Sequence, residues 1–309
     1  MSSLLKTQHI QELIKKASGL TVEGGDARLK KITERFLTDT IRLIEDFNVT
    51  PSEFWYAANY LARVGQSGEI GLVVAGLGLE HFLDLLQDKV EEEAGLDVKS
   101  GTPRTIEGPL YIEGAPLSKG EARLDQLAEN GEVLIMEGQV KDVAGKPVSG
   151  AIVDVWHANT KGNYSHFDQS QPAFNLRRRI ETDGEGRYKF RSILPSGYAV
   201  PPEGTTNQFL KSIGRHGNRP AHIHFFVSAP GYRKLTTQIN IEGDEYIYDD
   251  FAYATRDGLI PPVVRHSTAA EIQAKGLNEP FVTIHFDFTL HREEAGLPAA
   301  EVERLHAPA

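Results

Sequence analysis

Two histidines carry the first chemical signal in this chain of 309 residues. His222 and His224 lie in the run RHGNRPAHIHFFV, residues 215–227, whose second half is typical of a β-strand. Side chains alternate between the two faces of a strand, so both imidazoles point to the same side. Imidazoles on one rigid face are common metal ligands, although two hydrogen-bonded strand histidines without a metal would give the same pattern.

The other ligands of such a site must be sought elsewhere in the chain. There are no cysteines, which excludes disulfides, thiolate ligands, iron–sulfur clusters and a cysteine nucleophile. The histidine strand has no carboxylate, and no H-E-x-x-H helix is present. Tyr164 and Tyr198 each follow a predicted strand, where binding residues concentrate. The chain has ten tyrosines, and spacing alone does not identify which of them could be metal ligands. Tyr188, within RYKF, is expected in the core.

Composition narrows the class of protein. A net charge of -10 argues against nucleic acid or an anionic membrane as the main partner. The longest apolar run, residues 70–79, is too short for a membrane span, and no glycine-rich phosphate loop is found. The opening residues MSSLLKTQHIQEL do not have the pattern of an export signal, so a cytoplasmic location is predicted.

The first hundred residues have the periodicity of amphipathic helices. Helices are expected around residues 10–17, from near Asp26 to residue 44, from Pro51 to about Val64, and over 79–90. Thr50 and Glu53 form a capping-box pattern at the start of the third helix. A helical domain is therefore predicted over residues 1–100, as a linker or dimerisation part.

Residues 101–309 alternate short β-rich runs with turn signals. Strands are expected at 133–140, 151–156, 187–193, 222–228, 236–241 and 281–290. The turns DVAGKP and TDGEG separate the earlier ones. Short strands at such spacing favour a β-sandwich over a parallel sheet, so the fold class is mainly β with a helical N-terminal part.

Three segments in order resemble the intradiol ring-cleaving dioxygenases. They are DVWHANTKGNYSHFD (154–168), ILPSGY (193–198) and GRHGNRPAHIHF (214–225). The segments TPRTIEGPLY (102–111) and DDFAYATR (249–256), with the helical N-terminus, are similar to the catechol 1,2-dioxygenase type. The likeness covers essentially the whole chain. It implies cleavage of catechol by O2 between the hydroxyl-bearing carbons to give cis,cis-muconate, in the β-ketoadipate pathway of aromatic catabolism.

The resemblance also implies the cofactor and its ligands. One non-haem Fe(III) per subunit would be held by Tyr164, Tyr198, His222 and His224. Ferric iron favours anionic oxygen, and a phenol ionises readily beside such a charge. Two phenolates and one hydroxide balance the formal charge of the ion, and a neutral site is easier to bury than a charged one.

Roles for further residues follow from the same resemblance. Tyr198 leaves the metal and acts as general base, Arg219 stabilises charge developing on the substrate, and Gln238 supports Arg219. The positions that match the family's substrate pocket are all apolar: Leu72, Ala75, Ile106, Pro109, Leu110, Phe251 and Ala252. These apolar residues suit an unsubstituted aromatic ring and offer no partner for a carboxylate, so protocatechuate is disfavoured as a substrate. Some members of the family have proline at the position of Ala75, so substituted catechols stay open as substrates.

Partners and rival functions complete the expectations. The resemblance implies a homodimer through the N-terminal helices, with a lipid in a tunnel at that helical interface. Two other functions fit the same residues: a β-sandwich module that only binds, and a zinc hydrolase using the histidine pair with a carboxylate and water.

Overall fold

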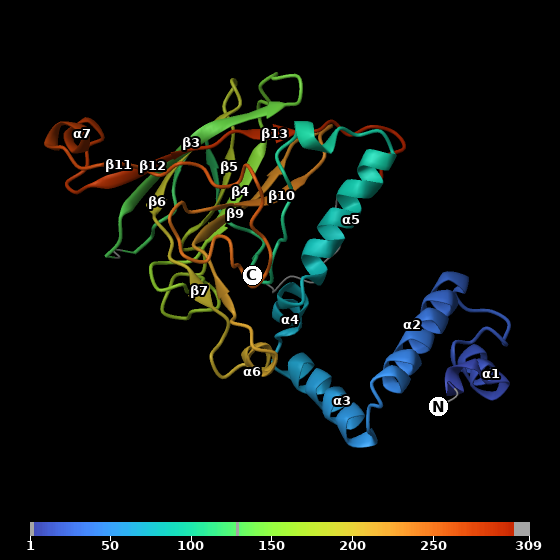
Figure 1. The fold of residues 1–309 in the computed structure, drawn as a ribbon. Helices are drawn as coiled ribbons and strands as arrows, with labels where there is room; N and C mark the ends of the chain where they lie inside the picture. Colours follow the sequence, from blue (N-terminus) through green and yellow to red (C-terminus); the bar gives the residue numbers. More distant parts are fainter. Residues whose placement is uncertain (1–2, 128–129, 300–309) are drawn as a thin grey trace. The chain divides into compact units, whose positions relative to one another are not determined.

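The computed structural model describes residues 3–127 and 130–299 (Figure 1). By its internal contacts the chain separates into two compact units, Met1–Gln66 and Ser67–Ala309. The division into domains 1–100 and 101–309 was drawn from composition, and it stays a prediction. The helical character of the N-terminal part and the β character of the remainder are confirmed.

The first unit is helical. It contains η1 (Leu4–Lys6), α1 (Gln8–Ala17), α2 (Ala27–Asp46) and α3 (Pro51–Gln66). The Asp26 side chain caps α2 by accepting the backbone N–H of Leu29 at 2.8 Å. The capping box at α3 is present, because Thr50 and Glu53 each accept the other's backbone N–H. The predicted end of this helix was two residues short: α3 continues to Gln66.

The second unit begins with helices that bring the chain to the sheets. These are α4 (Ile70–Gly76), α5 (Leu79–Glu93) and the 3-10 turn η2 (Val98–Ser100). Gly78 separates α4 from α5 and has a φ of 71°, a conformation that glycine adopts without strain. In the described part of the chain no single helix is long and apolar enough to cross a membrane. Only α4 and α5 taken together pass that test, and they are bent by 66°.

Two sheets form the body of the second unit. The first sheet runs in the order β1 (Leu117–Lys119), β5 (Arg177–Glu181), β4 (Ile152–His157), β9 (His222–Ser228) and β10 (Leu235–Asn240). The second runs in the order β11 (Val264–His266), β12 (Phe281–His285), β3 (Val133–Asp142), β6 (Arg187–Ile193) and β2 (Glu121–Arg123), and β13 (Phe288–Leu290) also pairs with β3. The short ribbon β7 (Tyr198–Ala199) and β8 (Asn218–Arg219) stands apart, and α6 (Thr205–Ser212) and α7 (Ala269–Ala274) lie in connections.

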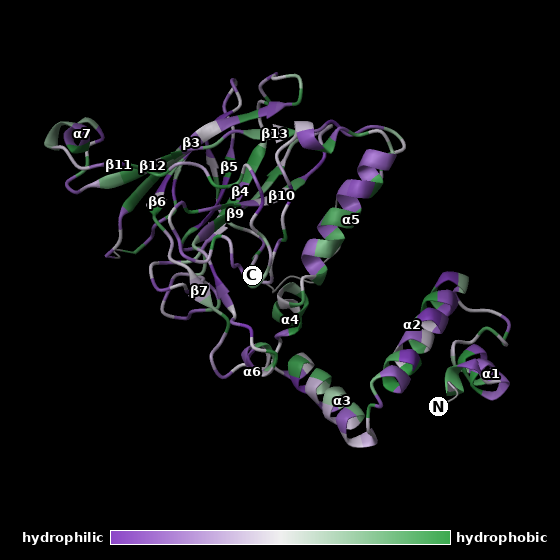
Figure 2. Cartoon of the chain, in the orientation of Figure 1, coloured by the Kyte–Doolittle hydropathy of each residue, from purple (hydrophilic) through white to green (hydrophobic). Residues whose placement is uncertain are grey.

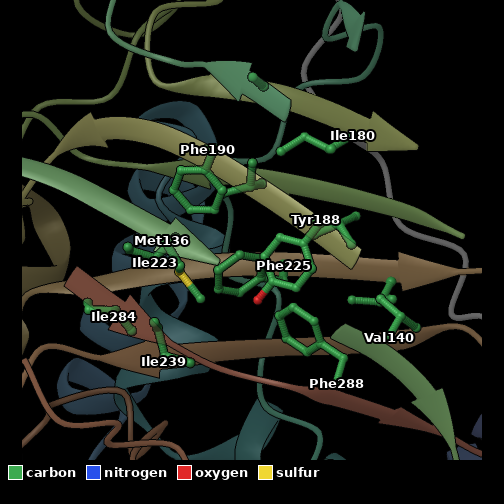
Figure 3. Packing of buried hydrophobic residues seen from close by; sticks show 14 of the residues in the cluster. Met136, Val140, Ile180, Tyr188, Phe190, Ile223, Phe225, Ile239, Ile284 and Phe288 are labelled. Atoms are coloured by element: carbon green, nitrogen blue, oxygen red, sulfur yellow. The ribbon is translucent and has the colours of Figure 1, made fainter. Parts of the chain in front are cut away.

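The main hydrophobic core lies between the two sheets (Figure 3). Ile223 and Phe225 of β9 meet Phe190 of β6 and Met136 of β3 there, and all four side chains are fully or almost fully buried. Burial of large apolar side chains from both sheets is what holds a sandwich together. The predicted β-sandwich is therefore confirmed.

The strands match the predicted ones best where they are long. β6 and β9 have the predicted limits, whereas the expected strand over 281–290 is divided into β12 and β13. At the break, Phe286 donates its backbone N–H to the Glu137 carbonyl at 3.0 Å. Strands of two or three residues, such as β7 and β8, carry too few residues to show an alternating pattern.

Candidate metal centre

The two histidines lie on the face of β9 that is turned away from the main core. β9 is flanked by β4 and β10, so its backbone is held on both sides. Because Ile223 and Phe225 face the core, His222 and His224 share the opposite face, where both are buried. Their Nε2 atoms are 3.1 Å apart. The strand thus delivers two ring nitrogens to one point.

Both imidazoles are neutral at neutral pH. Burial, and then the charge of Arg219, lowers the pKa of His222 to about 3. Burial and the neighbouring His222 lower the pKa of His224 well below its ordinary value. Nδ1 of His222 is 2.6 Å from the carbonyl oxygen of Pro220, so Nδ1 carries the proton and Nε2 is unprotonated. This is the form in which histidine binds a metal.

Tyr164 approaches the histidines from the connection between β4 and β5. Its Oη is 3.3 Å from Nε2 of His222, and the ring is buried. Asn159 shapes this connection, because its Oδ1 accepts the backbone N–H groups two and four residues ahead at 2.9 and 3.0 Å. Arg177 holds the following residue, donating to Oγ and O of Ser165 at 2.9 and 3.1 Å. The phenol is therefore fixed by the backbone on either side of it.

Tyr198 enters from β7, which pairs antiparallel with β8 so that Tyr198 lies opposite Arg219. Its ring centroid is 5.6 Å from that of Tyr164 and 5.5 Å from that of His222. A side chain at Gly162, where φ is +79°, would bring its Cβ within 2.5 Å of the Tyr198 Cβ. Glycine at that position lets the Tyr164 connection pass close to Tyr198. Tyr198 is only partly buried, unlike Tyr164.

The phenol of Tyr164 needs a cation before it can ionise near neutral pH. Burial raises its pKa well above the ordinary value, and a negative charge on Tyr198 would raise it further. The positive charges of Arg219 and Arg177 act in the opposite direction but do not outweigh burial. A strong cation bound to the oxygen reverses this balance.

Arg219 and Gln238 are brought together beside the histidines. Arg219 donates through Nε and Nη2 to Asp250 at 3.2 and 3.1 Å, and through Nη2 to Oε1 of Gln238 at 2.8 Å. Its Nη1 is 3.0 Å from Nε2 of His222. Burial alone would lower the pKa of Arg219, but Asp250 outweighs it and raises the value. The guanidinium stays charged, with one nitrogen directed at the site.

The donor atoms fit a small, hard metal ion. Metal bonds to histidine nitrogen of about 2.0–2.1 Å place neighbouring ligand atoms roughly 3 Å apart. The separations of 3.1 and 3.3 Å around Nε2 of His222 agree with that spacing. Within residues 3–127 and 130–299, no three His, Asp or Glu side chains form a group that could hold a metal. Tyrosine oxygen is thus the donor nearest to the histidine pair.

Most of the predicted pocket residues gather in one cluster. Buried Ala75, Ile106, Phe251 and Ala252 pack together, and the partly buried Leu72 lies against them. The same cluster contains three buried residues that were not among the predicted pocket residues: Val200, Leu210 and Ala254.

The other two pocket candidates lie on the connection before β1. Leu110 packs against a second cluster that includes Tyr164. Pro109 is exposed and lies beside Gly71. A Cβ built on Gly108 would be 3.7 Å from Cε1 of His224, so this connection passes over the histidine pair.

A cavity of about 490 Å³ lies elsewhere in the second unit. It is lined by residues of α5, of the connection after η2, and of the segments around β10 and β13. None of the four predicted metal ligands lines it.

Comparison with known proteins decides the family. A family model described as "Dioxygenase" matches residues 106–292, and one described as "Catechol dioxygenase N terminus" matches residues 26–95. The chain belongs to the intradiol dioxygenase family. Members of this family use non-haem iron, which agrees with the oxygen and nitrogen donors described above.

Similarity to individual dioxygenases extends over nearly the whole chain. "Catechol 1,2-dioxygenase 2" of Acinetobacter lwoffii is 59% identical over 84% of this chain and 94% of its own. "Catechol 1,2-dioxygenase" of Acinetobacter baylyi is 51% identical over 97% of both chains. The solved structure of a mercury-inhibited catechol 1,2-dioxygenase from Acinetobacter sp. ADP1 superposes with a TM-score of 0.94, at 49% identity over 99% of both chains.

Asp250 is a residue of the dioxygenase site that the sequence pattern missed. Replacing it with asparagine leaves Arg219 buried beside the histidines without its counter-charge. We expect Asp250→Asn to lower the free energy of unfolding by about 3 kcal/mol, measured by urea denaturation. Asp249→Asn is the matched control, because that side chain is 78% exposed and contacts His216. Equal losses in the two variants would contradict the role given to the buried pair.

The same pair has a predictable pH dependence. Burial raises the pKa of Asp250, but Arg219 outweighs burial and brings it below the ordinary value of 3.8. A lowered pKa means that the stabilisation is present above about pH 4 and is lost as pH falls through the lowered value. The difference in stability between wild type and Asp250→Asn should therefore shrink only at strongly acidic pH.

Proposed function

We propose that the protein opens the ring of catechol with O2, between the two hydroxyl-bearing carbons, and forms cis,cis-muconate. The reaction belongs to aromatic catabolism through the β-ketoadipate pathway. One observation carries the proposal: in a member of the intradiol family, Nε2 of His222 lies 3.1 Å from Nε2 of His224 and 3.3 Å from Oη of Tyr164. The relatives named above are catechol 1,2-dioxygenases, which supports catechol as the substrate.

The proposed cofactor is one Fe(III) per subunit, held by Tyr164, Tyr198, His222 and His224. Two anionic phenolates and two neutral imidazoles suit a hard trivalent cation and leave one positive charge for a hydroxide to balance. When bound, the ion draws electron density from a chelated catechol and so opens the ring carbons to attack by O2.

Tyr198 is proposed as the group that moves a proton. Its ring is less buried than that of Tyr164, so it has more freedom to leave the metal. Its freed phenolate Oη would then accept the proton of a catechol hydroxyl as general base. Tyr164 remains fixed by hydrogen bonds to its two neighbours in the chain, because Asn159 binds the N–H of Asn163 and Arg177 binds Ser165.

Arg219 is proposed to stabilise negative charge that develops on the bound substrate. Nη1 is its one nitrogen that is not bonded to Asp250 or Gln238. Gln238 also donates to Oδ1 of Asn240 at 2.7 Å. This second hydrogen bond fixes the orientation of the Gln238 amide that accepts from Arg219. A donor fixed in advance in a buried site loses little energy to reorganisation when charge appears.

The apolar pocket is proposed to select an unsubstituted ring. Five of its seven predicted residues form one packed cluster, and none of the seven offers a partner for a carboxylate. Burying an unpaired carboxylate is costly, which disfavours protocatechuate. A zinc hydrolase is less well supported, since no carboxylate joins the histidine pair among the described residues. A non-enzymatic β-sandwich module would not require buried nitrogen and oxygen atoms to converge on one point.

A homodimer through the N-terminal helices is part of the proposal. No residue of α2 is buried, and four of its large apolar side chains are exposed: Leu29, Ile32, Phe36 and Leu43. Figure 2 shows apolar residues interspersed along α2 and α3. A second subunit would remove this surface from water, and a lipid could occupy a tunnel between the paired helices. A cytoplasmic location is proposed together with these partners.

The visible spectrum and the reaction product test the function directly. Iron-loaded protein should be red, because phenolate-to-iron charge transfer gives a broad visible band. Anaerobic catechol should shift that band, and admitting O2 should give cis,cis-muconate with one O2 consumed per catechol. A colourless protein that stays inactive after iron loading would overturn the proposal.

Two tyrosine variants test the assignment of the ligands. We expect Tyr164→Phe to lose most of its iron or to shift the visible band, because a ligand oxygen is removed. Tyr188→Phe is the control, since Tyr188 is equally buried but donates to the carbonyl of Phe286 in the main core at 2.7 Å. Tyr188→Phe should keep its bound iron and its visible absorption band, and its free energy of unfolding should fall by about 1 kcal/mol. Equal effects on iron binding would mean that the ligands are wrongly assigned.

A further inference from the structure

The two histidines of the site are held in different ways. Nδ1 of His222 donates a hydrogen bond to the carbonyl oxygen of Pro220, which fixes the orientation of that ring. Nδ1 of His224 is buried and has no hydrogen-bond partner in the described part of the chain. A metal-binding histidine almost always uses its second nitrogen in such a bond. His224 needs another means of orientation.

That means is a stacked indole. The ring of Trp156 lies parallel to that of His224, with an interplanar angle of 4° and a centroid separation of 4.9 Å. The contact is fixed by the sheet, because β4 and β9 pair antiparallel with Trp156 opposite His224. The two side chains project from neighbouring strands on one face.

Aromatic neighbours hold the indole in turn. Tyr111 and Phe226 contact Trp156 at centroid distances of 4.9 and 4.8 Å, with interplanar angles near 60°. Tyr111 donates its hydroxyl to Oδ2 of Asp154 at 2.8 Å, which anchors the group. Like Nδ1 of His224, Nε1 of Trp156 is buried and has no hydrogen-bond partner among the described residues. Packing, rather than hydrogen bonding, therefore orients both rings.

We propose that Trp156 is the positioning residue for His224, and that its indole face holds the imidazole in the plane in which Nε2 meets the metal. The inference rests on the proposed function, because it assumes that His224 binds iron. A metal–imidazole bond lies in the plane of the ring, so a ring that turns about its Cβ–Cγ bond moves Nε2 off the metal. The indole restricts that turn for His224, as the Pro220 carbonyl does for His222.

Substitutions at Trp156 separate this role from simple filling of space. Trp156→Phe keeps an aromatic face against the imidazole, whereas Trp156→Leu removes it, and both variants reduce volume. We expect Trp156→Leu to bind iron about tenfold or more weakly than wild type, measured by competition with a chelator. Trp156→Phe should lie close to wild type, and the charge-transfer band should shift more in the Leu variant.

Two control variants complete the experiment. Phe226→Leu removes a ring that packs on the indole but is not stacked on His224, so it should lower stability to urea while iron affinity stays within about threefold of wild type. Trp55→Phe replaces the chain's second tryptophan, which lies exposed on α3, and should change neither quantity. If Trp156→Leu does not fold, Trp156→Met takes its place as the variant without an aromatic face.

The outcomes distinguish this inference from the proposed function. Iron affinity that is equal in wild type, Trp156→Phe and Trp156→Leu would overturn the role of the indole and leave the function intact. An equal loss of affinity in Phe226→Leu and Trp156→Leu would also overturn it, since packing alone would then explain both. Wild-type protein that binds no iron would overturn the proposed function, and the positioning role with it.

Discussion

The site depends on nitrogen and oxygen atoms with lone pairs that are buried close together. Nε2 of His222 and Nε2 of His224 are 3.1 Å apart, and the hydroxyl of Tyr164 is 3.3 Å from the first. Burial keeps the imidazoles neutral and raises the pKa of the phenol, so Tyr164 stays protonated near neutral pH unless a cation is bound. A cation at their meeting point satisfies all of them together. The surrounding fold serves to keep the atoms in this otherwise unfavourable arrangement.

The sandwich achieves this through the two faces of β9. One face contributes Ile223 and Phe225 to the core between the sheets, and that burial fixes the strand. Side chains alternate between the two faces of a strand, so once Ile223 and Phe225 are in the core, His222 and His224 must lie on the other face. The tyrosines come from connections instead, and each connection is fixed by its own contacts: Arg177 on Ser165 for one, and the short β7–β8 ribbon for the other. A rigid strand and two braced connections together set the positions of the donors.

The sequence predicted the fold class and the longer elements because their signals are local. The short β-rich run of β9 and the capping box of Thr50 and Glu53 are examples. Spacing alone could not select Tyr164 and Tyr198 from ten tyrosines; the resemblance to the dioxygenases did so. As ligands they remain predictions, although the structure brings their rings to within 5.6 Å of each other between centroids. Their convergence depends on contacts between distant segments, which periodicity does not encode.

Residues around the site were missed for similar reasons. Asp249 and Asp250 are adjacent and chemically identical, and only the fold makes one exposed and the other the partner of Arg219. Trp156 precedes His157 in a strand that looks like ordinary core, and its stacking on His224 follows from the register between β4 and β9. A tryptophan in a strand gives no sign of its cross-strand neighbour until the pairing is known.

The most direct test of the central claim is an anomalous difference map from crystals of the iron-loaded protein, recorded at the iron absorption edge. The account predicts one peak per subunit, within bonding distance of Oη of Tyr164, Oη of Tyr198, and Nε2 of His222 and His224. A peak bonded to other residues, or a well-ordered site in which either tyrosine lies far from the metal with no substrate bound, would contradict it.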